Sequence, residues 1–129
     1  LGHQMGDRLL REVGARIAGA LQRTSDTVAR LGGDEFAVLL PTESVDGAVR
    51  VAQRLAEVLA EPMVIEGQLV DVGASIGVAG FPDHGSDAPT LLRCADVAMY
   101  GAKRNGSGVG VYDPRHDENT PERLSLMAE

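Results

Sequence analysis

The chain has 129 residues, of which 43% are hydrophobic, and this is enough for one domain with a buried core. Its formal net charge of −7 argues against a nucleic-acid-binding surface, which needs clustered lysine and arginine side chains. The single cysteine, Cys94, excludes an internal disulfide and suits a reducing compartment. Because no apolar run approaches the roughly 20 residues of a transmembrane helix, we expect a cytoplasmic domain; any membrane anchor of a parent protein would lie outside this chain.

Three stretches of the sequence have apolar residues at helical spacing. The first covers about residues 6–21. Ser44 can cap the second helix, and Pro62 ends it. Either Ser86 or Asp87 can cap the third helix. The Asn-Gly pair at residues 105–106 ends this helix. The sequence therefore predicts three amphipathic helices, each with one face to bury.

Short apolar runs between these helices predict strands, and glycine-rich turns join some of them into hairpins. The run over residues 74–79 is small and apolar on both faces, as a buried strand would be. Helices that alternate with hairpins imply an α+β fold, with a mixed, mainly antiparallel sheet flanked by helices. The predicted strands are residues 27–31, 35–40, 63–65, 69–72 continuing through 74–79, and 109–112.

The first hairpin carries the sequence RLGGDEF, which begins at Arg30, at its tip. Gly-Gly-Asp is an ordinary turn sequence and turn tips are usually solvated, so geometry alone could account for it. Two features favour a binding site instead. The adjacent carboxylates of Asp34 and Glu35 repel unless a positive charge lies nearby, and a hard divalent cation is the usual partner. Gly32 and Gly33 would also let a ligand approach the main chain closely.

Residues 30–36 match the signature of the GGDEF domain, the catalytic domain of diguanylate cyclases, and four other segments resemble the same family in the same order. Five ordered matches over about residues 1–112 are far more specific than any one of them. The resemblance implies a ferredoxin-like, nucleotidyl-cyclase-like fold for residues 1–113. The four further segments are GHQMGD at residues 2–7, RTSD at 23–26, SIGVA at 75–79 and ADVAMYGAK at 95–103.

The resemblance implies a reaction in which two GTP molecules, one on each domain of a homodimer, condense to cyclic di-GMP with release of pyrophosphate. Phosphoryl transfer depends on positioning and charge neutralisation more than on covalent help from the protein. By resemblance, Asp34 and Glu35 are catalytic and hold Mg²⁺ or Mn²⁺, and Asp34 is the family's proposed proton acceptor. Gly32 and Gly33 would keep the hairpin thin beneath the triphosphate.

Three further residues are implied to contact the substrate. From the sequence alone, Asp7 could be a helix-start residue beside a surface histidine, and Lys103 a cation favoured by a helix end. By resemblance, Asp7 accepts hydrogen bonds from guanine, His3 lies beside the nucleotide, and Lys103 contacts the triphosphate. The family usually has an arginine where this chain has Ser107, and a serine cannot supply that charge.

Arg23 and Asp26 could form no more than a loop ion pair of little energetic weight. By resemblance, they are the RxxD product-inhibition site, where Arg23 takes phosphate or guanine in a fork and Asp26 takes a guanine edge. Arg54, on the following helix, stands where the family places a second arginine for this site. Arg50, one turn earlier, could simply be solvated.

Both ends of the chain depart from a complete domain of this family. The family's central first strand, which carries an aspartate metal ligand, a lysine and an asparagine, precedes the element at residues 2–7 and is absent here. We therefore expect unpaired strand edges that favour self-association, and little or no cyclase activity from this chain alone. Residues 114–129 resemble a linker and the start of a helix, capped by Thr120, that lead into an EAL phosphodiesterase domain.

Two functional hypotheses follow. The chain is either part of a diguanylate cyclase or a catalytically degenerate regulatory domain that binds GTP or cyclic di-GMP and controls an adjacent EAL phosphodiesterase. A ligand-free interaction domain is a third hypothesis, which the ordered motifs oppose. Cys94 is expected to be a small buried thiol, and His84 and His116 lack a second ligand at metal spacing.

Overall fold

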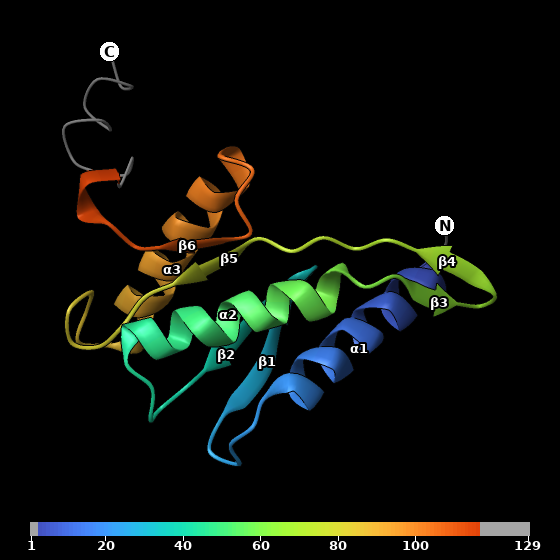
Figure 1. Cartoon of the computed structure of the whole chain (residues 1–129), viewed down its shortest axis with the longest axis horizontal. Helices are drawn as coiled ribbons and strands as arrows, with labels where there is room; N and C mark the ends of the chain where they lie inside the picture. The colour runs from blue at the N-terminus through green and yellow to red at the C-terminus, as the bar shows by residue number, and fades with distance from the viewer. Residues whose placement is uncertain (1–2, 117–129) are drawn as a thin grey trace. The chain divides into compact units, whose positions relative to one another are not determined.

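A computed structural model of the chain describes residues 3–116, and these form the predicted α+β fold (Figure 1). The chain divides into two compact units after Ala74. The final segment predicted as a linker and helix start lies beyond the described residues, apart from a short 3₁₀ turn. The elements are α1 (His3–Ala20), β1 (Thr27–Gly32), β2 (Glu35–Leu39), α2 (Val45–Ala60), β3 (Met63–Ile65), β4 (Gln68–Val70), β5 (Ile76–Val78), α3 (Ala88–Arg104), β6 (Val109–Val111) and η1 (Pro114–His116).

The first unit is built on two helices, α1 and α2, that lie side by side (Figure 1). Helix α1 also packs against β1 and β3. The buried residues of α1 and α2 recur mostly four positions apart, so each helix turns one apolar stripe inward, as the sequence predicts. The buried apolar residues of this unit are Val13, Ile17, Val51, Ala52, Leu55, Leu59, Met63 and Ile65.

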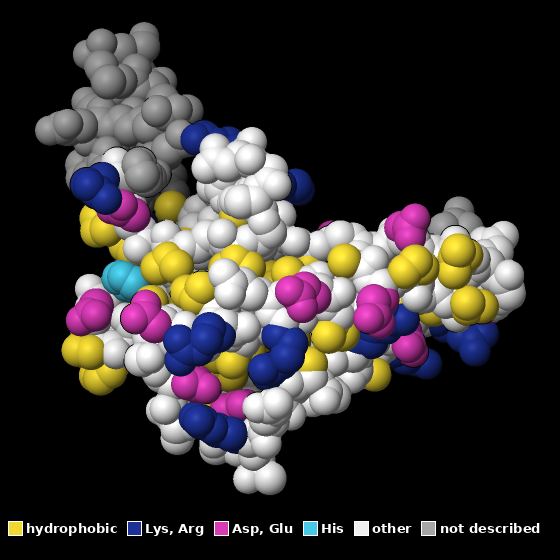
Figure 2. Space-filling model, viewed as in Figure 1, with side chains coloured by type: hydrophobic (Ala, Val, Ile, Leu, Met, Phe, Trp, Pro, Cys, Tyr) yellow, Lys and Arg dark blue, Asp and Glu magenta, His cyan; other side chains and the backbone are white. Residues whose placement is uncertain are grey.

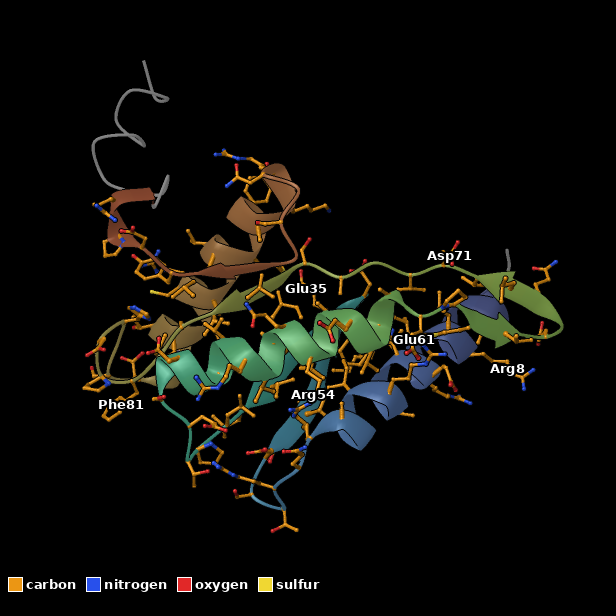
Figure 3. The ribbon with its side chains drawn as sticks, in the orientation of Figure 1. Arg8, Glu35, Arg54, Glu61, Asp71 and Phe81 are labelled. Atoms are coloured by element: carbon orange, nitrogen blue, oxygen red, sulfur yellow. The ribbon has the colours of Figure 1, made fainter. Side chains whose placement is uncertain are left out.

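Two arginines tie α1 and α2 together at opposite ends. Arg16 of α1 donates to the carbonyl oxygens of Glu61 and Pro62, at 2.8 and 3.2 Å, just beyond the end of α2. Arg54 of α2 donates in turn to the carbonyl oxygen of Ala20, the last residue of α1, at 3.0 Å; Figure 3 shows it reaching away from α2. Arg54 therefore binds a carbonyl group at the C-terminal end of α1, and Arg16 binds two just beyond the end of α2. A cation is also favoured at the C-terminal end of a helix.

The predicted helix caps are confirmed. Ser44 has an extended backbone and its hydroxyl accepts a hydrogen bond from the amide of Gly47 at 3.1 Å, which starts α2. Asp87 plays the same part for α3, accepting from the amide of Thr90 at 2.8 Å. Helix α1 begins three residues earlier than predicted, at His3, and ends at Ala20.

Both predicted hairpins form. Strands β1 and β2 pair antiparallel from Thr27 opposite Leu39 onward, and β3 pairs with β4 across a turn at Glu66 and Gly67. Both turn residues have positive φ, 51° and 81°, as a two-residue hairpin turn requires. The predicted continuation of the second arm through residues 74–79 is wrong, because β4 ends at Val70 and the chain is extended without pairing until β5.

The second unit consists of a parallel pair, β5 and β6, covered by α3. Gly77 and Gly110 lie opposite each other in this pair. A Cβ atom on Gly77 would overlap the backbone of α3 at Ala95 and Met99, and one on Gly110 would lie 2.8 Å from the carbonyl oxygen of Ala98. Two facing glycines therefore let the helix backbone rest directly on the strands. The buried apolar residues here are Val78, Cys94, Ala98 and Ala102, which confirms the buried thiol.

The pairing is mixed and mainly antiparallel, as predicted, but it is distributed over three two-stranded sheets, β1–β2, β3–β4 and β5–β6. No strand among residues 3–116 hydrogen-bonds these pairs into one sheet. The described helices include none with both the length and the apolar character needed to span a bilayer.

Candidate functional site

The tip of the β1–β2 hairpin is shaped by its two glycines and by Arg30. Gly32 and Gly33 have φ values of 147° and 51°, which residues with a side chain rarely adopt. The guanidinium of Arg30 donates from Nε and Nη2 to the carbonyl oxygen of Gly33, at 3.1 and 2.9 Å. Apart from each glycine and its chain neighbours, no atom lies within 4 Å of a Cβ position on either residue, so the backbone there is open to a ligand.

Asp34 and Glu35 follow this turn directly, and both are exposed. Within residues 3–116, no three or more histidine, cysteine, aspartate or glutamate side chains lie close enough together to hold a metal ion by themselves. Two adjacent carboxylates nevertheless suit Mg²⁺, which is usually held by one or two carboxylates together with waters and substrate phosphates. The hairpin tip therefore fits a metal–nucleotide complex better than a metal ion alone.

The residues predicted to contact GTP come from both units. Asp7 lies on the exposed side of α1 in the first unit. The backbone of His3 opens the same helix, and its side chain lies outside the described part. Lys103 is exposed in the last turn of α3, in the second unit.

Ser107, where the family usually has arginine, belongs to the end of α3. Gly106, with φ of 70°, follows the helix, and the amides of Gly106 and Ser107 donate to the carbonyl oxygens of Lys103 and Ala102, at 3.3 and 3.0 Å. This is a Schellman motif, in which two of the last helical carbonyls are satisfied by the chain turning back. The Ser107 hydroxyl also donates to the carbonyl oxygen of Ala102, at 3.4 Å, so this side chain is hydrogen-bonded to the last turn of α3.

A second candidate site lies beside α2, where Arg23, Asp26 and Arg54 line one pocket of about 230 Å³. The three residues come from the loop after α1 and from the middle of α2, so the structure brings together the set predicted for product inhibition. Figure 2 shows basic and acidic side chains gathered over α2, in dark blue and magenta. The remaining lining residues are Gln22, Glu43, Gly47, Arg50 and Val51.

Two polar atoms of this pocket are buried without a hydrogen-bond partner. They are Oδ1 of Asp26 and Nε of Arg54. A buried polar atom left unpaired costs free energy, and both atoms lie beneath the pocket surface, since neither is accessible to solvent.

Comparison with known proteins shows the family of the chain. The family model described as "Diguanylate cyclase, GGDEF domain" matches residues 1–109. The chain belongs to the GGDEF family. It is 39% identical over 127 residues to MucR of Pseudomonas aeruginosa, a bifunctional diguanylate cyclase and cyclic di-GMP phosphodiesterase, and it covers 18% of that protein. It is 46% identical over 110 residues to the diguanylate cyclase TpbB of Pseudomonas aeruginosa. This match covers 84% of the chain and 25% of TpbB. The chain thus spans a quarter or less of these relatives.

Solved structures of GGDEF domains have the same fold. An EAL/GGDEF domain protein of M. capsulatus is 42% identical, with a TM-score of 0.81 over 88% of this chain and 74% of that one. The GGDEF domain of DgcB from Caulobacter crescentus, solved in complex with c-di-GMP, is 28% identical, with a TM-score of 0.71 over 85% of this chain and 66% of that one.

Sequence reasoning missed two charged residues of the pocket in this GGDEF domain. Arg50, interpreted as simply solvated, lines the pocket one turn from Arg54. Glu43 was not singled out, yet its carboxylate lies 3.5 Å from the guanidinium of Arg23. A usable signal was present for Arg50, since residues four apart share a helix face. No local signal indicated Glu43, because its contact with Arg23 spans 20 positions of the chain.

Proposed function

We propose that this chain is part of a diguanylate cyclase that condenses GTP to cyclic di-GMP in a homodimer and is inhibited by its product at the pocket beside α2. The observation that carries the proposal is this pocket, which brings Arg23, Asp26 and Arg54 together. Its three guanidinium groups, Arg50 included, outnumber its two carboxylates, so it favours an anion in a chain whose net charge is −7.

In the pocket, the arginines would hold the ligand's phosphates and guanine oxygens. Arg23 would form a forked, charge-assisted pair with phosphate or guanine. The Asp26 carboxylate would accept from a guanine N–H, and the Arg54 guanidinium would donate to a ligand oxygen.

At the hairpin tip, Asp34 and Glu35 would hold Mg²⁺ or Mn²⁺. The ion, when bound with GTP, would neutralise charge on the phosphates. Gly32 and Gly33 would allow the triphosphate to lie against bare backbone, and Asp34 would accept the proton of the attacking 3′-hydroxyl. Asp7 would accept from guanine, with His3 beside the base, and Lys103 would contact the phosphates.

Titration calorimetry on the 129-residue chain tests both sites. We expect cyclic di-GMP to bind the wild type, and the Arg23→Ala variant to lose at least about tenfold in affinity. Arg11→Ala, which removes an exposed arginine of α1, is the matched control and should bind like the wild type. For the hairpin, we expect GTP binding to require Mg²⁺ and to weaken in Asp34→Asn. Absence of cyclic di-GMP binding would contradict the product site, and Mg²⁺-independent GTP binding would contradict the metal site.

The second candidate function is a regulatory domain that binds GTP or cyclic di-GMP and controls an adjacent EAL phosphodiesterase. Ser107 favours it, because this side chain is engaged with the end of α3 and brings no charge to a phosphate. The likeness to MucR, named for both activities, is consistent with a tandem parent. A cyclase assay on the parent protein separates the two: turnover of GTP supports the enzyme, whereas GTP binding that changes only phosphodiesterase activity supports the regulator.

A further inference from the structure

Glu43 lies where the pocket beside α2 meets the start of that helix. It directly precedes the cap residue Ser44, and its side chain is only 21% exposed. Its carboxylate lies 3.5 Å from Nη1 of Arg23, and the same Nη1 donates to the hydroxyl of Thr42. The arginine that we propose for phosphate recognition is therefore already engaged by two neighbouring side chains of the loop before α2.

The space for this carboxylate depends on Gly47. A Cβ atom at Gly47 would overlap Oε1 of Glu43 and lie 3.0 Å from its Cδ, so the carboxylate fills the volume that a larger residue would take. Gly47 is buried in the first turn of α2, where free backbone N–H groups favour a negative charge. The Glu43 carboxylate thus lies beside the start of α2 and close to Arg23, in space that is available because residue 47 has no side chain.

A dinucleotide that enters the pocket brings phosphates to the same arginine. Nη1 of Arg23 carries two N–H groups, and with one donated to Thr42 and the other facing Glu43 it cannot also donate to a phosphate. Two anions side by side also repel. Arg50 and Arg54 have no ion pair with Glu43 among those of the described residues, so the competition centres on Arg23.

We propose that Glu43 is a built-in competitor for the anionic ligand of this pocket. Its carboxylate occupies Arg23 when the pocket is empty and yields it when cyclic di-GMP binds. Glu43 thereby lowers the affinity for the product and raises the concentration at which inhibition sets in. This inference rests on the proposed product site and adds to it the residue that sets its threshold.

Two variants release Arg23 by different means. Glu43→Gln removes the charge but keeps the size of the side chain. Gly47→Ala keeps the charge and displaces the carboxylate, because the added methyl group takes its place; the atoms that must move are the end of a flexible side chain. Alanine is also a better helix former than glycine, so this variant should melt no lower than the wild type.

The test is calorimetric titration of the 129-residue chain with cyclic di-GMP. Because the pair is partly exposed, we expect each variant to bind about three- to tenfold more tightly than the wild type. Asp46→Asn is the matched control, since it removes an exposed acid from the same helical turn but does not line the pocket, and it should change affinity less than about twofold.

The outcomes separate this inference from the proposed function. If the wild type binds cyclic di-GMP in an Arg23-dependent way and Glu43→Gln binds it no more tightly, the competitor role is overturned. The proposed product site is then still supported. Weaker binding by Glu43→Gln would overturn it as well, since Glu43 would then contact the ligand favourably, as a carboxylate can at a guanine edge. If neither the wild type nor Glu43→Gln binds, the proposed product site falls and the competitor role falls with it.

Discussion

Arg30 donates two hydrogen bonds, from Nε at 3.1 Å and Nη2 at 2.9 Å, to the carbonyl oxygen of Gly33. This contact closes the tip of the β1–β2 hairpin across a register shift between Arg30 and Gly32. Two consecutive glycines would otherwise leave the tip with many backbone conformations. The arginine therefore fixes the direction in which the chain leaves Gly33, and with it the position of Asp34.

Replacing Arg30 by alanine should weaken the hairpin as a binding site without unfolding the protein. We expect Mg²⁺-dependent GTP affinity to fall about fivefold, because a flexible tip must be ordered on binding. The midpoint of thermal unfolding should change by less than about 2 °C, since the contact is exposed. Arg11→Ala serves as control in calorimetry and circular dichroism. Unchanged GTP affinity in Arg30→Ala would show that the tip is already ordered without this side chain.

Arg54 and Arg50 should differ in their effect on stability although both line the product pocket. Arg54→Ala removes the donor to the Ala20 carbonyl, so we expect the free energy of unfolding to drop by about 1 kcal/mol. Arg50 is exposed, and Arg50→Ala should change it by less than about 0.5 kcal/mol. Urea denaturation measures both values, and equal losses in the two variants would contradict a tethering role for Arg54.

Gly77→Ala should disrupt the second unit. The added methyl group would overlap backbone atoms of α3, which cannot move aside as a side chain can, so we expect a loss of at least about 3 kcal/mol in stability. Gly101→Ala is the control, because it lies in α3 with open space around it and should be neutral or stabilising by up to about 1 kcal/mol. Thermal melts of the two variants within about 2 °C of each other would contradict the close helix–strand contact.

The cap of α3 should make stability fall at acidic pH. Hydrogen bonds from the side chain and backbone of Thr90 hold the pKa of Asp87 below its ordinary value. A lowered pKa in the folded state means that this stabilisation is present above the unfolded-state pKa of about 4 and is lost as pH falls below it. Asp87→Asn keeps a capping side chain that does not titrate.

Urea denaturation of the wild type and of Asp87→Asn between pH 3 and pH 6 measures this effect. Other carboxylates titrate equally in both proteins, so their difference isolates Asp87. We expect the advantage of the wild type over the variant to shrink as the pH falls through about 4. A difference that stays constant over this range would show that the Asp87 charge does not contribute to the cap.

Much of the local structure follows from the sequence because its causes lie within a few residues. Ser44 and Asp87 bond to amides three positions away, and Gly67 supplies the positive φ that its turn needs. The extent of β4 was predicted wrongly because its cause does not lie within a few residues. The small, apolar run at residues 74–79 indicates burial, but a strand also needs a partner, and no sequence pattern shows how far one extends.

The sequence by itself determined the elements, the family motifs and the charges at the hairpin tip, since these depend on residue type and short spacing. The tertiary structure alone decided that Arg54 both binds the end of α1 and lines the pocket. It also decided that the Glu43 carboxylate lies 3.5 Å from Arg23, in the space beside Gly47. It also decided that Gly77 faces Gly110 beneath α3. These relationships join residues about 20 to 35 positions apart, and packing fixes them through contacts that no local preference encodes.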